Sequence, residues 1–269
     1  LEFRRVLFRS YNTKYMRRRE KFVMMAILLG VVLWLIQFAP LAWRSLAIFA
    51  FGVLTYFASA LALKAHFDKK IWLTYLTLPT FYSLTIGFFY FLLPTNFLSL
   101  IAVLGFFSLG IYVLFLTGNI LSPRERKIQL HLVAQNTTLF FTTMIALLST
   151  QTIFSFNLPF YLGPLLILWS HFFLFYNIIW SIDPNAPLSF ANAQLAFFSS
   201  LLVSEVVLAL SFLPIAPWHL ALLSMAVFYL LACILNTYLS AKFFRRAMAE
   251  YLLLAVFILL MFVCFFPGK

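Results

Sequence analysis

The chain has 269 residues, of which 64% are hydrophobic and 10% are charged, and its formal net charge is +12. So few charged side chains cannot cover a surface in water, and a backbone immersed in lipid must form its hydrogen bonds internally. The composition therefore excludes an ordinary soluble domain. It predicts an all-α, polytopic bundle of transmembrane helices whose partner is the lipid bilayer.

The first residues need separate treatment. Residues 1–10, LEFRRVLFRS, resemble a translated sequencing-library adapter, and we set residues 1–15 apart as a non-native or disordered leader. Met16 is the expected natural start, and residues 16–269 are expected to form a single transmembrane domain. The first ten residues carry three Arg and one Glu, so the net charge without them is +10.

Hydrophobic stretches then recur along the whole chain. A helix rises about 1.5 Å per residue, so roughly 20 residues cross the roughly 30 Å of hydrocarbon in a bilayer. On this basis we expect nine spans, at residues 22–39, 45–63, 71–93, 97–121, 128–149, 159–182, 189–212, 219–240 and 250–267.

Basic residues gather in alternate loops between these spans. They precede the first span and follow the second, fourth and eighth spans, whereas the other side carries Arg44 and Lys269. Because basic loops stay in the cytoplasm, the N-terminus is expected inside and the C-terminus outside. Short basic blocks beside apolar spans are typical of contact with anionic lipid headgroups and argue against binding of nucleic acid.

Two parts of the chain are weakly alike. FLLPTNFLSL (91–100) opens the fourth span, and FLPIAPWHLALL (212–223) opens the eighth. Each of these spans ends near an Asn that is followed by Leu, Ser and a basic loop. Spans 1–4 and 5–8 are therefore either parallel repeats or segments that match only through their composition.

Glu205 is the one acidic residue well inside an expected span. Residues at four-residue spacing before it are small, and small side chains let helices approach closely: Asn192, Ala196, Ser200 and Ser204. We therefore expect Glu205 to face protein or water. It is either a proton or cation site, an acid/base group, or a protonated carboxyl bonded to a neighbouring helix.

Polar residues also mark one face of the fifth span, namely His131, Gln135, Thr138, Thr142 and Ser149. Such a face either lines an aqueous path or joins helices through hydrogen bonds worth about 0.6–2 kcal/mol each, and we favour the second interpretation. Thr142 and Glu205 fall at similar depth, so a contact between them is feasible.

No catalytic residue, metal or cofactor is predicted. His171 lies near the middle of the sixth span and is expected to pack rather than to ligate. The four histidines differ in depth, whereas catalytic zinc usually has about three converging protein ligands. Cys233 and Cys264 are expected to be free. The sequence contains no H-E-x-x-H, no G-x-S-x-G and no phosphate-binding glycine loop.

Four segments are similar to a family of uncharacterised bacterial polytopic inner-membrane proteins: FYFLLP (89–94), LTGNI with RKIQL (116–130), TIFSFNLPF (152–160) and NIIWSI (177–182). The resemblance covers the third to sixth spans. It implies a bacterial inner membrane and transfers no active residue. It also implies an acidic residue near Gly118, which is not found here.

Three functions remain open. The preferred one is a non-enzymatic protein that transports or binds a small or lipidic solute, because Glu205 and the polar face of the fifth span offer candidate sites. The first alternative is a structural or assembly subunit of a membrane complex. The second is a membrane-embedded enzyme that modifies lipid, which needs acid/base groups that converge at one depth.

Overall fold

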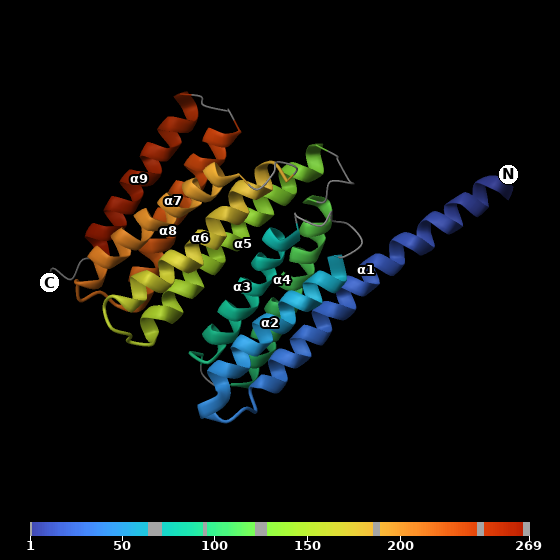
Figure 1. Cartoon of the computed structure of the whole chain (residues 1–269), viewed down its shortest axis with the longest axis horizontal. Coiled ribbons are helices and arrows are strands. Elements are labelled where there is room, and N and C mark those ends of the chain that lie inside the picture. The colour runs from blue at the N-terminus through green and yellow to red at the C-terminus, as the bar shows by residue number, and fades with distance from the viewer. Residues whose placement is uncertain are drawn as a thin grey trace.

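The computed structural model describes residues 2–63, 72–93, 96–121, 128–184, 189–240 and 245–265, and in this part the chain is all-α (Figure 1). A single turn of 3-10 helix, η1 (Leu41–Trp43), leads into α2. The α-helices of the described part are α1 (Glu2–Ile36), α2 (Arg44–Leu63), α3 (Trp72–Tyr90), α4 (Phe97–Leu121), α5 (Ile128–Ser155), α6 (Leu162–Ile182), α7 (Phe190–Ser211), α8 (Pro217–Leu239) and α9 (Arg245–Phe265).

The predicted all-α class is confirmed in the described residues, and each expected span overlaps one described α-helix. The fourth span and α4 have the same bounds, 97–121. The largest extensions beyond the expected spans are in α5, which continues to Ser155, and in α1, which begins at Glu2. The helix α1 thus runs through residues 2–15, where the sequence suggested a leader, and the origin of those residues stays a prediction.

Six of the described helices, α2 and α4 to α8, are long and apolar enough to cross a membrane. The described part of α9 adds a shorter apolar helix, Ala249–Cys264. By helix length and hydropathy, the chain is an integral membrane protein. Half of the basic residues that predict its orientation fall outside the described residues: Lys64, Lys69, Lys70, Arg124, Arg126, Lys127, Lys242 and Lys269.

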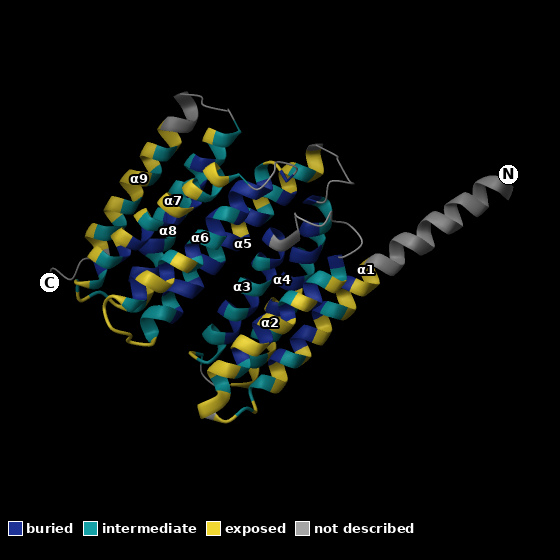
Figure 2. Ribbon diagram, in the orientation of Figure 1, coloured by how far each residue is buried: buried dark blue, intermediate teal, exposed yellow. Residues whose placement is uncertain are grey.

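Successive helices run in opposite directions, with α1 at one edge of the bundle and α9 at the other (Figure 1). Buried residues follow the lines where helices meet, and exposed residues cover the outer faces (Figure 2). Among the described elements, α9 packs closely on α8 alone. Its Leu252, Leu253 and Leu259 are 63–71% exposed, which suits a helix surrounded by lipid tails.

The first eight helices form two four-helix units with the same packing pattern. Within the unit α1 to α4, the closely packed pairs are α1–α4, α2–α3, α1–α2, α3–α4 and α2–α4. The unit α5 to α8 has the five corresponding pairs. Composition alone does not select helix partners, so this correspondence supports the parallel repeat suggested by the two similar segments.

Within the first unit, two tyrosines of α3 pack against glycines of α4. The hydroxyls of Tyr75 and Tyr82 both donate to backbone carbonyl oxygens of α4. A Cβ atom at Gly118 would lie 2.8 Å from Cζ of Tyr75, and one at Gly110 would lie 2.5 Å from Cζ of Tyr82. Both rings are buried, so these positions of α4 need glycine because the rings approach its backbone closely.

We therefore expect Gly118→Ala to lower stability by about 1–3 kcal/mol, because the added methyl group overlaps a buried ring that has no room to move. The measurement is the midpoint of thermal unfolding in detergent micelles. Gly105→Ala is the matched control on the same helix, since nothing lies within 4 Å of a Cβ atom there. Equal midpoints for Gly118→Ala and the wild type would contradict the packing of α3 on α4.

Candidate functional site

Two residues of the polar face on α5 bond to the end of α6. The Nε2 atom of Gln135 donates to the carbonyl oxygens of Ser181 at 3.1 Å and Ile182 at 3.3 Å. His131 Nε2 lies 3.3 Å from the Ile182 oxygen and 3.1 Å from Nε2 of Gln135. Because the last carbonyls of a helix have no partner within it, these side chains cap α6.

The other members of the face bond within their own helix. Thr138 donates to the carbonyl oxygen of Ala134 and Thr142 to that of Thr138, each at 2.9 Å. Both threonines are buried, as is Ser149, which donates to the Ala146 oxygen at 3.2 Å. These three residues are therefore buried, but their hydrogen bonds lie within α5 and do not join it to another helix.

Glu205 is exposed on the outer face of α7 and is not packed among the described helices, and the expectation that it faces protein or water stays a prediction. The small residues before it are oriented as expected: Ala196, Ser200 and Ser204 are buried, and Ser204 donates to the Pro164 oxygen of α6 at 2.8 Å. Each residue turns about 100° around a helix axis, so the residue after Ser204 points away from α6. Thr142 is fully buried, so the structure does not bring it together with Glu205.

His171 is fully buried between α6 and α8, as expected for a packing histidine. Its Nδ1 atom lies 3.2 Å from the hydroxyl of Ser170, and its ring stands edge-on to Phe228, with 5.2 Å between the centroids. Its Nε2 atom is buried without a hydrogen-bond partner. The candidate groups His131, His171 and Glu205 thus occupy a helix end, the core and the outer surface.

One connecting residue received no role from the sequence. Asn177 of α6 is buried, and its Nδ2 atom donates to the Thr77 hydroxyl of α3 at 2.7 Å and to the Phe173 carbonyl oxygen at 2.8 Å. The bond to Thr77 joins the two four-helix units. Its only sign in the sequence is an amide side chain within an apolar span.

The described residues hold no group of three His, Cys, Asp or Glu side chains that suits a metal ion. Cys233 and Cys264 are both free, as expected.

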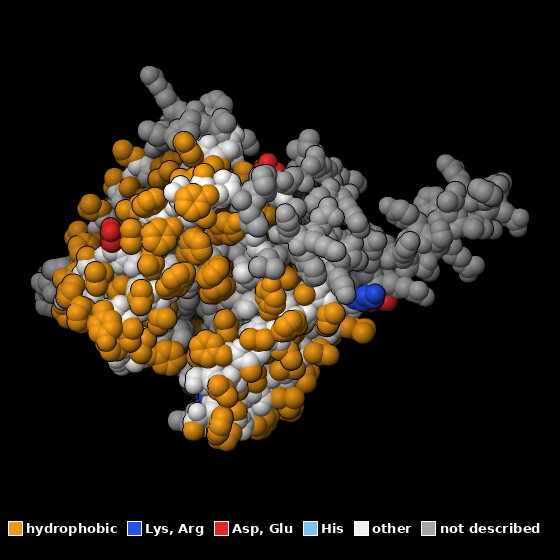
Figure 3. Space-filling view, in the orientation of Figure 1, with side chains coloured by type: hydrophobic (Ala, Val, Ile, Leu, Met, Phe, Trp, Pro, Cys, Tyr) orange, Lys and Arg blue, Asp and Glu red, His pale blue; other side chains and the backbone are white. Residues whose placement is uncertain are grey.

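Open grooves run between helices on the outer faces. The α1–α4 groove has a volume of about 440 Å³, the α5–α8 groove about 620 Å³, and the α6–α7 groove about 400 Å³. Their walls are mainly apolar and aromatic, and hydrophobic side chains cover most of the described surface in Figure 3. The α5–α8 groove is lined by Asn136, Phe140 and Thr143, a different face of α5 from the polar one.

Because Gln135 caps α6, we expect Gln135→Met to lower the stability of the fold by about 1–3 kcal/mol, since the α6 carbonyl oxygens lose their hydrogen-bond donor. The measurement is the midpoint of thermal unfolding in detergent, which should fall. Gln129→Met is the matched control, because Gln129 is exposed on the same helix. An unchanged midpoint for Gln135→Met would show that the cap contributes nothing.

No protein-family model matches the chain, and neither a curated protein nor a solved structure matches it. The resemblance noted in the sequence therefore identifies no family. What is established is an all-α chain with six helices of membrane-spanning length and hydropathy in its described part.

Proposed function

We propose that this chain is a nine-span integral membrane protein, without enzymatic activity, that binds a lipidic ligand in grooves on its bilayer-facing surface. The observation that carries this proposal is a groove at the same place in each four-helix unit, between the first and fourth helices. Such volumes fall in the range of sites for small molecules, and their apolar walls suit acyl chains.

Nine spans are supported by the three helices outside the six that qualify by length and hydropathy. Each lies beside a qualifying helix: α1 packs on α4, α3 on α2, and α9 on α8. With 19 residues, α3 is about 28 Å long. The basic loops favour a cytoplasmic N-terminus.

Nine crossings place the two chain ends on opposite sides of the membrane. Fusion of an alkaline phosphatase or green fluorescent protein reporter to each end measures this directly. We expect fluorescence from the N-terminal fusion and phosphatase activity from the C-terminal fusion. Both ends in one compartment would contradict an odd number of spans.

Binding is favoured over transport along a polar path. The polar face of α5 forms hydrogen bonds within α5 and to the end of α6, and Glu205 lies on the outer surface of α7. An enzyme that modifies lipid has less support, because His131, His171 and Glu205 do not converge.

Native mass spectrometry of the protein purified in a mild detergent tests the proposal. We expect at least one lipid molecule to stay bound after detergent removal, because an interhelical groove holds an acyl chain through many dispersion contacts. A helical, folded protein that appears only as the bare chain would contradict lipid binding.

A structural or assembly subunit remains the second candidate, and the exposure of Glu205 favours it. An ionisable side chain among the exposed Leu202 and Val206 is costly in lipid, and a polar group from a partner helix would satisfy it. The same mass spectra distinguish this role. A second protein bound to the wild type and lost from Glu205→Leu would support assembly, and identical spectra would exclude it for this residue.

A further inference from the structure

A more polar pocket lies at the end of the first unit, and we name it the head pocket. It has a volume of about 350 Å³ and is formed where α1 ends, α2 begins, α3 ends and α4 begins. The residues that matter here are Gln37, Arg44, Phe91, Asn96, Phe97 and Leu100. Unlike the α1–α4 groove, this pocket is lined by a positively charged side chain, that of Arg44.

Arg44 is held at the wall of the head pocket. Its Nε atom donates to the Ala39 carbonyl oxygen at 3.2 Å, and its guanidinium carbon lies 5.0 Å from the centroid of the Phe91 ring. Among the described residues, no carboxylate pairs with it. The Nε hydrogen bond and the cation–π contact therefore position the guanidinium group, and its two terminal amino groups can bind an anion.

Two further donors line the same pocket. The Nε2 atom of Gln37 is buried without a hydrogen-bond partner, which costs about 1–3 kcal/mol unless a ligand supplies an acceptor. The helix α4 begins at Phe97, directly after Asn96, whose carbonyl oxygen accepts from the Leu100 N–H at 3.0 Å. The free N–H groups of that first turn, at the positive end of a 25-residue helix, attract anions.

The head pocket continues into the α1–α4 groove. On α1 the groove is lined by Ile27, Gly30, Val31 and Trp34, and the turn directly after α1 contributes Gln37 and Phe38 to the head pocket. Along α4, the residues that line both sites recur at helical spacing: Phe97, Leu100, Ile101, Leu104, Gly105 and Ser108. Residues three and four apart share one face of a helix, so the two sites lie end to end along α4.

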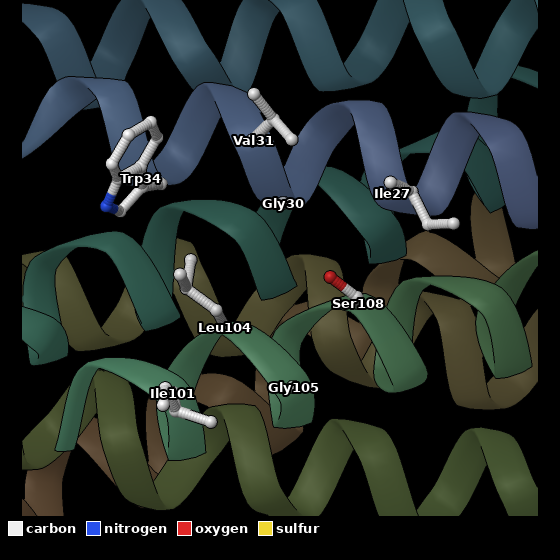
Figure 4. A pocket seen from close by; sticks show the side chains of 8 residues that line it. All are labelled: Ile27, Gly30, Val31, Trp34, Ile101, Leu104, Gly105 and Ser108. Carbon is white, nitrogen blue, oxygen red and sulfur yellow. The ribbon is translucent and has the colours of Figure 1, made fainter. Parts of the chain in front are cut away.

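Gly105 leaves space on the α4 side of this groove. Figure 4 shows the side chains of Ile27, Val31 and Trp34 on α1 and of Ile101, Leu104 and Ser108 on α4, with Gly30 and Gly105 on the ribbons of these two helices. A Cβ atom at Gly105 would have no atom within 4 Å, so the backbone itself forms part of the wall. Trp34 stands edge-on to the Phe38 ring, 5.3 Å between centroids, at the junction of the groove with the head pocket.

We infer that this composite site binds an anionic phospholipid, with its phosphate in the head pocket against Arg44, Gln37 and the start of α4, and with one acyl chain in the α1–α4 groove. The inference rests on the proposed lipid binding and names its site and ligand class. A cation with no described carboxylate beside it favours an anionic headgroup over a zwitterionic one, whose ammonium group would lack a partner here.

The test is a titration of delipidated protein in detergent, followed by native mass spectrometry. The probes are palmitoyl-oleoyl phosphatidylglycerol, the phosphatidylcholine with the same chains, and inorganic phosphate as competitor. We expect one tight phosphatidylglycerol per chain, about tenfold tighter than phosphatidylcholine, since one charge-assisted contact supplies a difference of that order. Inorganic phosphate is expected to compete only weakly because it has no acyl chain.

Three variants examine the two ends of the site. Arg44→Gln is expected to weaken phosphatidylglycerol about tenfold. Gln37→Met is expected to weaken it severalfold without loss of thermal stability, because the deleted Nε2 donor has no partner in the protein. Gly105→Leu is expected to fill the groove and weaken both phospholipids alike. Matched controls are Lys21→Gln and Ala102→Leu, at exposed positions on α1 and α4 that do not line the site.

The outcomes separate this inference from the proposed function. Lipid that stays bound with equal affinity in all three variants would overturn the site and leave lipid binding intact. Loss of binding in Arg44→Gln but not in Gly105→Leu, with strong competition by inorganic phosphate, would assign the pocket to free phosphate. A folded wild type that binds neither phospholipid would overturn both.

Discussion

The absence of water in the hydrocarbon of a membrane governs how this chain uses its polar side chains. A buried hydroxyl must find an acceptor nearby, and the nearest one is the carbonyl one turn back along its own helix. Thr55, Thr138 and Thr152 all bond in this way. Few polar groups then remain to connect helices, so Gln135, Asn177 and the α3 tyrosines carry much of the polar contact between them.

The same constraint explains what the sequence could predict. Long apolar runs separated by short polar links predicted each α-helix of the described residues, because lipid permits little else. Helix ends were harder. The fifth span was expected to end at 149, yet α5 continues to Ser155, since Ser155 and Gln151 bond to each other and Ser155 to the Gln151 carbonyl oxygen. Polar residues that satisfy one another locally do not end a helix.

Side-chain orientation was predicted less well than position. The row of small residues on α7 correctly indicated a close helix contact, and Ser204 forms it with α6. Glu205 is the next residue and therefore points about 100° away. The head pocket was not predicted at all, because Gln37, Arg44 and Asn96 belong to separate segments that only the tertiary structure brings together.

The contact of α3 with α4 has a consequence for motion within the membrane. Tyr82 bonds to the Phe106 oxygen at 2.9 Å, and Tyr75, two helical turns away, bonds to the Leu114 oxygen. Two such bonds at different heights along α3 oppose both sliding and rotation of one helix against the other. We therefore expect any rearrangement of the first unit to move α3 and α4 together.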